Sequence, residues 1–424
     1  MWLWLYSLVF YLVMPLVWLR LLWRARRQPE YLQRLGERHG YYAAFSPTPL
    51  IWVHAVSVGE TRAAEPLVEA LLRQYPGHIL LLTHMTPTGR ASGGELLARH
   101  PSRLMQAYLP YDLPDACARF LDHFQPQVGL LMETEIWPNL IAAAGRRRLP
   151  LALVNARLSA RSLGGYSRLK TLIGPALASL SAVAAQSAAD AERLRQLGAN
   201  DISVSGNLKF DVVPSLEKLQ LGAGWRQALG SRPVWLAAST RDGEEALILD
   251  AIDTLDVPGL LLVLVARHPQ RFAEVAELLR VRGLTFSRRS DETLPDIRTR
   301  VWLGDSMGEM AAYYALADLA LIGGTLLPFG GQNLIEAAAC GCPVLLGPHT
   351  FNFAQASEDA IACGAAHRVP DAGRAALVVG ELLRDRQRLG QMRVAAVRFS
   401  EAHRGATERT VALVRRLMEL RTAY

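Results

Sequence analysis

One carboxylate early in the sequence is placed where it could take a proton from a substrate. Glu60 ends the segment HAVSVGE, which follows a predicted strand and opens a predicted helix over 61–74. In the first turn of a helix the dipole stabilises a carboxylate, so we expect Glu60 to be ionised and able to accept a proton. A Glu that caps the helix N-terminus explains the same residue equally well.

Two more carboxylates, Glu133 and Glu135, stand at the end of another predicted strand, in the segment ETEIWPN. The Trp-Pro that follows stops the strand, so the pair is expected on a turn that faces a ligand. A solvated turn with one capping acid is the alternative interpretation. The segments NARLS (155–159) and GNLKFD (206–211) follow strands in the same way. Their basic residues, among them Lys209, could hold a phosphate or a sugar carboxylate.

The most specific motif is a glycine-rich turn in the second half of the chain. The segment FGGQNLIEAAA begins at Phe329 and is followed by a predicted strand from Pro343. Backbone N–H groups at 330–333 and the dipole of the following helix predict an anion site. Asn333 and Glu336 are three residues apart and share one helix face, where the carboxylate could accept hydrogen bonds from a ribose diol. Helix capping with tight packing is the alternative.

Two further segments, ARHP (266–269) and GDSMGE (304–309), lie at the ends of predicted strands in the same half. They are therefore expected to face the same cleft as the glycine-rich turn. A lone histidine such as His268 is more often a loop residue than a catalyst.

These motifs require strands whose carboxyl ends meet at one edge of a sheet. After Pro47, short apolar runs alternate with helical patterns in two similar halves, which is typical of parallel α/β sheets. The predicted strands are 50–54, 79–83, 128–132, 151–155 and 182–185 in the first half, and 234–238, 260–266, 301–304, 319–322 and 343–346 in the second. Two doubly wound sheets of this kind bind ligands in the cleft that faces their carboxyl ends.

The N-terminus has the pattern of a membrane anchor. Residues 1–19 contain no charged side chain, and four arginines follow, at positions 20, 24, 26 and 27. About 19 to 22 apolar residues just reach across a bilayer core, and basic residues after the run place the rest of the chain in the cytoplasm. We expect a single anchor that either spans the bilayer or is half inserted. An apolar helix buried in the fold is the alternative.

Composition excludes several classes of protein. The 424 residues are 50% hydrophobic and carry a net charge of +7, so the chain is globular and suited to anionic partners. Four cysteines form no disulfide framework, and Cys340 and Cys342 are expected to be small core residues rather than metal ligands. The sequence lacks G-x-G-x-x-G, G-K-[ST] and G-x-S-x-G, which disfavours a dehydrogenase, a P-loop NTPase and an α/β-hydrolase.

Taken in order, six segments resemble the Kdo transferases, membrane-anchored glycosyltransferases that attach 3-deoxy-D-manno-octulosonic acid (Kdo) to lipid A precursors in Gram-negative bacteria. The segments are HAVSVGE, ETEIWPNL, NARLS, GNLKFD, GDSMGEM and GGTLLPFGGQNLIEAAACGCPVLLGP. The resemblance covers almost the whole chain. It implies an α/β GT-B fold, in which two Rossmann-like doubly wound domains face a cleft, with an N-terminal membrane-anchor helix. It also implies CMP-Kdo as donor and inversion at the anomeric carbon.

The resemblance implies five segments with different tasks. They are a membrane anchor (1–23), a Rossmann-like acceptor domain (24–210), a linker (211–231), a Rossmann-like donor domain for CMP-Kdo (232–385) and C-terminal helices (386–424). The enzyme would then act in lipopolysaccharide core biosynthesis at the cytoplasmic face of the bacterial inner membrane.

The resemblance also implies roles for individual residues. Glu60 would be the general base that takes the proton from the acceptor hydroxyl. Glu133 or Glu135, together with Lys209, would steady the transition state, and the motif does not distinguish between these two carboxylates. The expected donor-binding residues are Arg267, His268, Met307, Gly308, Glu309, Asn333, Leu334, Ile335 and Glu336. Amides and cations would meet the charge of the leaving group, so neither a metal nor a cofactor is expected.

The expected partners are CMP-Kdo, a lipid A precursor and the anionic surface of the inner membrane, and not nucleic acid. Two other functions fit parts of the sequence. One is a GT-B transferase that uses a UDP-sugar to modify another membrane lipid intermediate, which would leave HAVSVGE and ETEIWP unexplained. The other is a catalytically silent, membrane-bound binding protein of the same fold.

Overall fold

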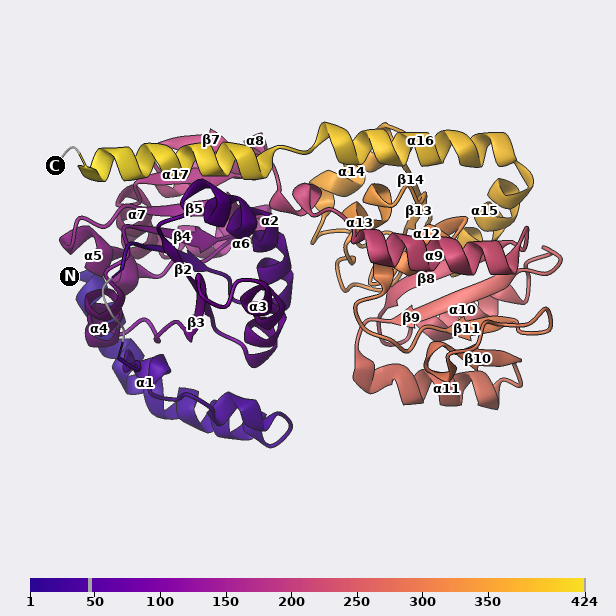
Figure 1. Ribbon diagram of the computed structural model, residues 1–424, viewed down its shortest axis with the longest axis horizontal. Coiled ribbons are helices and arrows are strands. Elements are labelled where there is room, and N and C mark those ends of the chain that lie inside the picture. The colour runs from indigo at the N-terminus through magenta and orange to yellow at the C-terminus, as the bar shows by residue number, and fades with distance from the viewer. Residues whose placement is uncertain (45–47, 423–424) are drawn as a thin grey trace. The chain divides into compact units, whose positions relative to one another are not determined.

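The computed structural model describes residues 1–44 and 48–422, and the chain divides into two compact units (Figure 1). Unit 1 comprises residues 1–212 together with the C-terminal segment from Arg404. Unit 2 comprises residues 213–403 and is inserted in the sequence between the two parts of unit 1.

Unit 1 is built on a parallel sheet of seven strands in the order β3-β2-β1-β4-β5-β6-β7. The strands are β1 (Leu50–His54), β2 (Ile79–His84), β3 (Leu104–Tyr108), β4 (Val128–Met132), β5 (Leu151–Ala156), β6 (Ala182–Ala185) and β7 (Ile202–Val204). The chain proceeds outward from β1 to one edge and outward from β4 to the other edge. The topological switch point, where sheets of this class bind ligands, therefore lies between β1 and β4.

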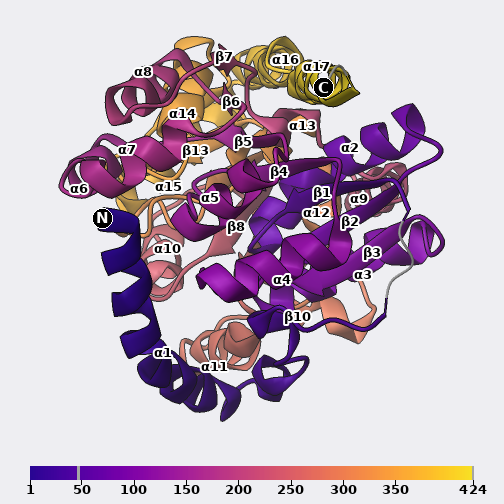
Figure 2. The same cartoon turned by 90° about the vertical axis from the view of Figure 1, so that its left-hand side faces the viewer.

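Helices cover both faces of this sheet (Figure 2). The helices of unit 1 are α1 (Trp2–Ala25), α2 (Val58–Gln74), α3 (Pro87–Arg99), α4 (Pro114–Phe124), α5 (Pro138–Arg146), α6 (Ala160–Ser167), α7 (Lys170–Ala178), α8 (Ala188–Leu197) and α17 (Ala406–Thr422), with short 3₁₀ turns η1 (Pro29–Leu32), η2 (Glu37–His39) and η3 (Leu208–Asp211). Of these, α1 lies outside the others, against α4 and α5. The helix α17 packs against α2 and η3 after the chain returns from unit 2. It therefore supports the two elements that bear Glu60 and Lys209.

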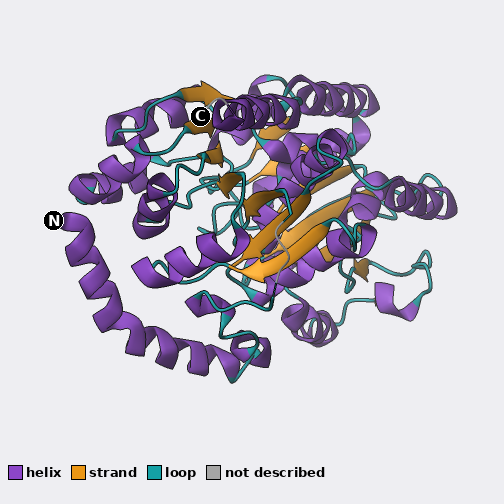
Figure 3. Ribbon diagram, turned by 60° about the vertical axis from the view of Figure 1, so that its left-hand side comes forward, coloured by secondary structure: helices purple, strands orange, loops and turns teal. Residues whose placement is uncertain are grey.

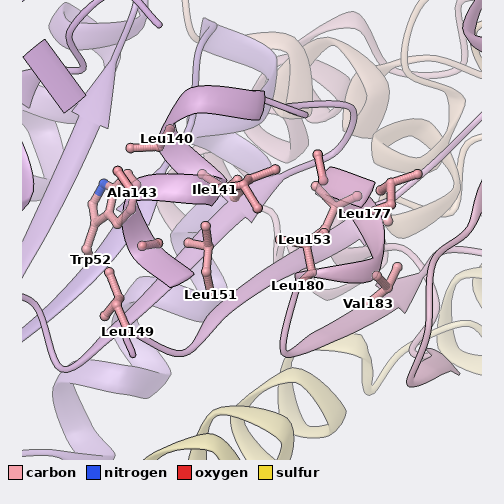
Figure 4. Packing of buried hydrophobic residues seen from close by; sticks show 14 of the residues in the cluster. Trp52, Leu140, Ile141, Ala143, Leu149, Leu151, Leu153, Leu177, Leu180 and Val183 are labelled. Carbon is pink, nitrogen blue, oxygen red and sulfur yellow. The ribbon is translucent and has the colours of Figure 1, made fainter. Parts of the chain in front are cut away.

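Successive side chains of each strand point to opposite faces of the sheet, so the core of unit 1 forms two layers. Trp52 and Leu151 pack with residues of α4, α5 and α7 on one face (Figure 4), whereas Ile51 and Val53 pack with α2 and α17 on the other. Gly129 in β4 allows the Trp52 ring to lie across the sheet, since a Cβ there would stand 2.6 Å from that ring. The interior strands β1, β4, β5 and β6 are buried on both faces, which explains their nearly continuous apolar sequences.

Unit 2 repeats the architecture with the strand order β10-β11-β9-β8-β12-β13-β14. Its strands are β8 (Val234–Thr240), β9 (Leu261–Ala266), β10 (Phe286–Arg288), β11 (Val301–Leu303), β12 (Leu319–Ile322), β13 (Val344–Leu346) and β14 (Ala366–Arg368). Its helices are α9 (Leu216–Leu229), α10 (Glu244–Ile252), α11 (Phe272–Val281), α12 (Met310–Leu316), α13 (Leu334–Ala339), α14 (Ala354–Ala362), α15 (Ala372–Arg384) and α16 (Arg386–Ala402), with η4 (Pro269–Arg271) and η5 (Arg289–Asp291). The switch point of this sheet lies between β8 and β12.

The segment expected as a linker, 211–231, is mostly helix. Residues 216–229 form α9, which packs against α12 and buries Trp225. Gly222 lets α9 and α12 approach closely, because a Cβ at this position would lie 2.2 Å from the carbonyl oxygen of Ala312. The glycine that suggested a loop is therefore needed for a contact between two helices. The expected C-terminal segment, 386–424, is divided, because α16 belongs to unit 2 and α17 to unit 1.

Candidate active site

The carboxylate of Glu60 lies at the start of α2, directly after β1. Ser57 is the N-cap of α2, and its hydroxyl donates to Glu60 Oε1 at 3.0 Å. The backbone N–H of Val56 donates to Glu60 Oε2 at 2.9 Å. Glu60 thus completes a capping arrangement, and the same two hydrogen bonds fix the position of its carboxylate at the switch point of the sheet.

The protonation of Glu60 differs from the expectation of a fully ionised carboxylate. Burial raises its pKa to about 7, the negative charges of Glu133 and Glu135 act in the same direction, and the hydrogen bonds from Val56 and Ser57 oppose them. Loss of solvation therefore outweighs the favourable helix terminus. At neutral pH the carboxyl group can exist in both forms, which suits a residue that must take up a proton in each turnover.

Glu133 lies at the carboxyl end of β4, where it holds two cations. Its Oε1 accepts from Lys209 Nζ at 2.9 Å, and its Oε2 pairs with Arg157 Nε at 3.0 Å. Burial alone would raise the pKa of Glu133, but the charges of Lys209 and Arg157 bring it below its usual value. Of the two candidate carboxylates, Glu133 is therefore the one that the structure joins to Lys209.

Glu135 has a different environment on the same turn. Its Oε2 accepts a hydrogen bond of 2.7 Å from the indole N–H of Trp137. Burial raises its pKa, and the nearby charge of Glu133 adds to this effect. Glu135 thus contributes to the negative potential around Glu60.

Two residues of this site have left-handed backbone conformations. Glu133 has φ of 54° directly after β4, and Asn155, the last residue but one of β5, has φ of 50°. The side-chain oxygen of Asn155 accepts from the backbone N–H of Leu208 at 3.1 Å, which fixes the residue before Lys209. A non-glycine residue in this region costs about 1–3 kcal/mol, and such residues gather at functional sites.

In unit 2, cations gather at the carboxyl ends of β8 and β9. The Nε of Arg267 donates to Gln332 Oε1 at 3.2 Å, which joins the loops after β9 and β12. Burial lowers the pKa of His268, and the positive charges of Arg241, Arg267 and Arg271 lower it further. This group of cations suits an anionic ligand.

The predicted residues Met307, Gly308 and Glu309 follow β11. Glu309 accepts from both Nε and a terminal nitrogen of Arg289, each at 3.1 Å, so this carboxylate is already held by an ion pair. The Ser306 hydroxyl also donates to it at 2.6 Å. Arg289 belongs to no motif identified in the sequence. It lies in η5, directly after the edge strand β10 and 20 residues before Glu309.

The glycine-rich turn differs in part from the expected anion cradle. The N–H groups of Gly331 and Gln332 donate to the carbonyl oxygens of Gly324 and Gly323, at 2.7 and 3.0 Å, so these two donors are used within the protein. Asn333 is the N-cap of α13. Leu334 and Ile335 are buried core residues, so only their backbone could reach a donor substrate. Glu336 lies in the first turn of α13.

Metal ligation has no support among the residues that the structure describes, where no group of three or more His, Cys, Asp or Glu side chains could hold an ion. Cys342 is buried, and burial raises the pKa of both Cys340 and Cys342. Both thiols are therefore poor metal ligands at neutral pH.

The two doubly wound parallel sheets define an α/β fold of the GT-B glycosyltransferase class. Two solved structures share the fold: a glycosyltransferase from Rickettsia africae ESF-5 (12% identity, 88% of this chain and 99% of that chain, TM-score 0.62) and the UDP co-structure of S. aureus MnaA (15%, 88% and 97%, TM-score 0.60).

Sequence comparison identifies the family within this class. The model of 3-deoxy-D-manno-octulosonic-acid transferase (kdotransferase) matches residues 33–212. The 3-deoxy-D-manno-octulosonic acid transferase of Bordetella pertussis is 48% identical over 96% of this chain and 97% of that protein, and that of Haemophilus influenzae is 40% identical over 83% and 84%. The chain belongs to the Kdo transferase family. It is a glycosyltransferase of lipopolysaccharide biosynthesis, and the family indicated by the six motifs is confirmed.

Proposed function

We propose that this enzyme moves Kdo from CMP-Kdo to a hydroxyl group of a lipid A precursor at the cytoplasmic face of the inner membrane, with inversion at the anomeric carbon and Glu60 as general base. The observation that carries the proposal is the position of Glu60. Its carboxylate lies at the switch point of unit 1 with a pKa of about 7, in the electrostatic field of Glu133.

In this mechanism the acceptor oxygen attacks the anomeric carbon of Kdo while Glu60 takes the hydroxyl proton. The bond from that carbon to the phosphate oxygen breaks, and its electron pair leaves with CMP. Proton transfer accompanies the attack because an alcohol is far less acidic than a carboxylic acid. A single displacement of this kind inverts the configuration at the reacting carbon. The pair formed by Lys209 and Glu133 would steady the charge that develops on the sugar.

Unit 2 would hold the donor. Arg267 and His268 lie among the cations at the carboxyl ends of β8 and β9, which suits the phosphate of CMP and the carboxylate of Kdo. Asn333, the N-cap of α13, and Glu336, in its first turn, would bind the ribose together with backbone groups of Leu334 and Ile335. Residues 307–309 would complete the site. The charge of the departing CMP would be met by these cations and amides.

The reaction can be tested by mass spectrometry of a tetra-acylated lipid A precursor incubated with CMP-Kdo and detergent-solubilised enzyme. We expect a mass gain of one or more Kdo units, and NMR of the product should show an anomeric configuration opposite to that of the donor. Inhibition by CMP should exceed inhibition by UDP. Stronger inhibition by UDP, or a retained configuration, would contradict the proposal.

The rate should depend on pH through Glu60. A base acts in its deprotonated form, so kcat/KM should fall as the pH drops through about 7 and reach a plateau above it. Replacing Glu133 by glutamine removes a negative charge that raises the pKa of Glu60, and should move this limb to lower pH. Glu277→Gln, on the surface of unit 2 and paired with the exposed Arg280, serves as the control and should leave the limb in place.

Donor affinity should depend on Arg267. The variant Arg267→Leu loses a cation that we assign to the donor, and a charged hydrogen bond contributes about 1.5–3 kcal/mol. We therefore expect the KM for CMP-Kdo to rise by about 10- to 100-fold, with a smaller change in kcat. Arg280→Leu, which removes an exposed ion pair with Glu277, is the matched control. An unchanged KM in Arg267→Leu would remove this residue from the donor site.

A further inference from the structure

The N-terminal helix α1 is attached to unit 1 along one side. The stripe formed by residues 7, 11, 14, 18, 21 and 25 repeats every three or four positions, and Ser7, Met14, Leu21 and Ala25 in it are buried. Met14 packs with Leu113 and Ala116, at the start of α4. This spacing is typical of the side of a helix that packs against another surface.

Polar contacts fix α1 on this surface along its first half. The hydroxyl of Tyr6 donates to Asp112 Oδ2 at 3.0 Å, and that of Ser7 donates to Asn139 Oδ1 at 2.9 Å. One turn further on, Tyr11 is hydrogen-bonded to Asp115. Near the other end, the ring of Trp18 stacks on His39 with 5.2 Å between the ring centroids. The side of α1 that faces unit 1 therefore carries specific hydrogen bonds.

The opposite side of α1 is apolar and exposed. It consists of Leu5, Leu8, Val9, Leu12, Leu16, Leu19 and Trp23. The helix contains Pro15 and bends along its length (Figure 3). Arginines at positions 20, 24, 26 and 27 lie at its C-terminal end. An apolar face with basic residues beside it is complementary to an anionic lipid surface.

By length and composition α1 could also cross a bilayer, and it is the one helix within the described parts of the chain that meets this criterion. The contacts argue against that arrangement. Asp115 is half exposed, pairs with Arg119 at 2.8 Å and is hydrogen-bonded to Tyr11 near the middle of α1. A spanning α1 would either draw this charged pair into the hydrocarbon, where charges are costly, or lose all its hydrogen bonds to unit 1.

We propose that α1 lies in the plane of the cytoplasmic membrane surface, docked on unit 1, with its exposed apolar face among the lipids and both of its ends on the cytoplasmic side. This inference rests on the membrane location in the proposed function. The occupant of the apolar face is a bilayer that contains anionic phospholipid.

The docked helix is also connected, through Asp112, to the helix that follows the turn of Glu133 and Glu135. The carboxylate of Asp112 accepts from the backbone N–H groups of Asn139 and Leu140, at 3.1 and 2.8 Å, besides the hydroxyl of Tyr6. These N–H groups open α5, which directly follows the turn that carries Glu133 and Glu135. If α1 lies in the plane of the membrane, the helix that contacts the lipids and the turn of Glu133 and Glu135 therefore belong to the same unit, connected through Asp112.

The test is a protease-protection experiment on the full chain, with one epitope tag before Met1 or, as a control, after Tyr424. In intact spheroplasts we expect protease to leave both tags uncut, and after lysis to remove both. Removal of the N-terminal tag alone from intact spheroplasts would show a spanning helix and overturn the proposal.

A second measurement uses flotation with vesicles of phosphatidylethanolamine and phosphatidylglycerol. Leu12→Asp with Leu19→Asp should weaken binding at least about tenfold, whereas Leu377→Asp, an exposed leucine of unit 2, should not change it. Equal binding of the double variant and the wild type would overturn the role of the apolar face. Kdo transfer is measured on the same preparations, so loss of the reaction is distinguished from loss of membrane binding.

Discussion

Replacing Glu60 by glutamine should lower kcat by about a thousandfold, because a positioned general base contributes about 10²- to 10⁴-fold. Glutamine keeps the size of the side chain and can still accept from the Val56 N–H, so α2 should begin at the same residue. The KM values for both substrates should change little. The measurement is single-turnover transfer of Kdo at pH 8, where the wild-type carboxylate is deprotonated.

The control for this experiment is Glu65→Gln, on the same helix and in a surface ion pair with Arg99. It should retain the wild-type rate. The residual rate of Glu60→Gln should also no longer fall as the pH drops through about 7, because the titrating carboxylate is absent. A variant with the wild-type rate and pH profile would leave Glu60 with a capping role alone.

Replacing Lys209 by methionine should be the most disruptive change at the site. Breaking a buried ion pair leaves a charge without its partner, and here Glu133 would keep only Arg157. We expect a loss of about 3 kcal/mol of stability in unit 1, seen as a fall of about 6 to 12 °C in its thermal transition. Transfer should decline as well, since the variant lacks the cation to which we assign the stabilisation of charge on the sugar.

The matched control is Lys218→Met, which removes an exposed pair with Glu217 and should leave both the thermal transition and the rate unchanged. Loss of stability alone could explain a lower rate. The rate is therefore measured well below the transition, and Glu133→Gln with Lys209→Met is compared with the single variant. If the double variant regains stability but not transfer, while Glu133→Gln alone still transfers Kdo, Lys209 acts in the reaction as well as in the fold. Full recovery of transfer would contradict its catalytic role.

The sequence predicted the interior strands of both sheets and missed the edges. Each of the ten predicted strands corresponds to a strand in the structure, whereas β3, β7, β10 and β14 were not predicted. These four are the outermost strands of the two sheets. An interior strand is buried on both faces and shows a continuous apolar run, but an edge strand such as Phe286–Arg288 has only three residues, two of them polar. Such short, partly polar strands have no hydrophobic pattern from which they could be predicted.

The site shows the same division between local and long-range information. Glu60 and Glu133 were predicted as candidates because Glu133 directly follows an interior strand and Glu60 opens the helix after one. The sequence could not give the pKa of Glu60, which depends on burial and on charges more than 70 residues away. It also could not decide that Glu133 rather than Glu135 meets Lys209. One overlooked signal is that only three of the 46 basic residues are lysines, at positions 170, 209 and 218.

The insertion of unit 2 within unit 1 has a consequence for the synthesis of the enzyme. Val414 and Leu417 of α17 complete the hydrophobic layer beneath α2, yet the ribosome makes them only after the whole of unit 2. Unit 2 is complete in sequence before α17 emerges, so we expect it to fold while unit 1 still lacks this helix. The helix that bears Glu60 would then gain its full support only after unit 2 has been synthesised. A nascent chain that stalls before residue 404 should therefore contain a folded unit 2 and an incompletely folded unit 1.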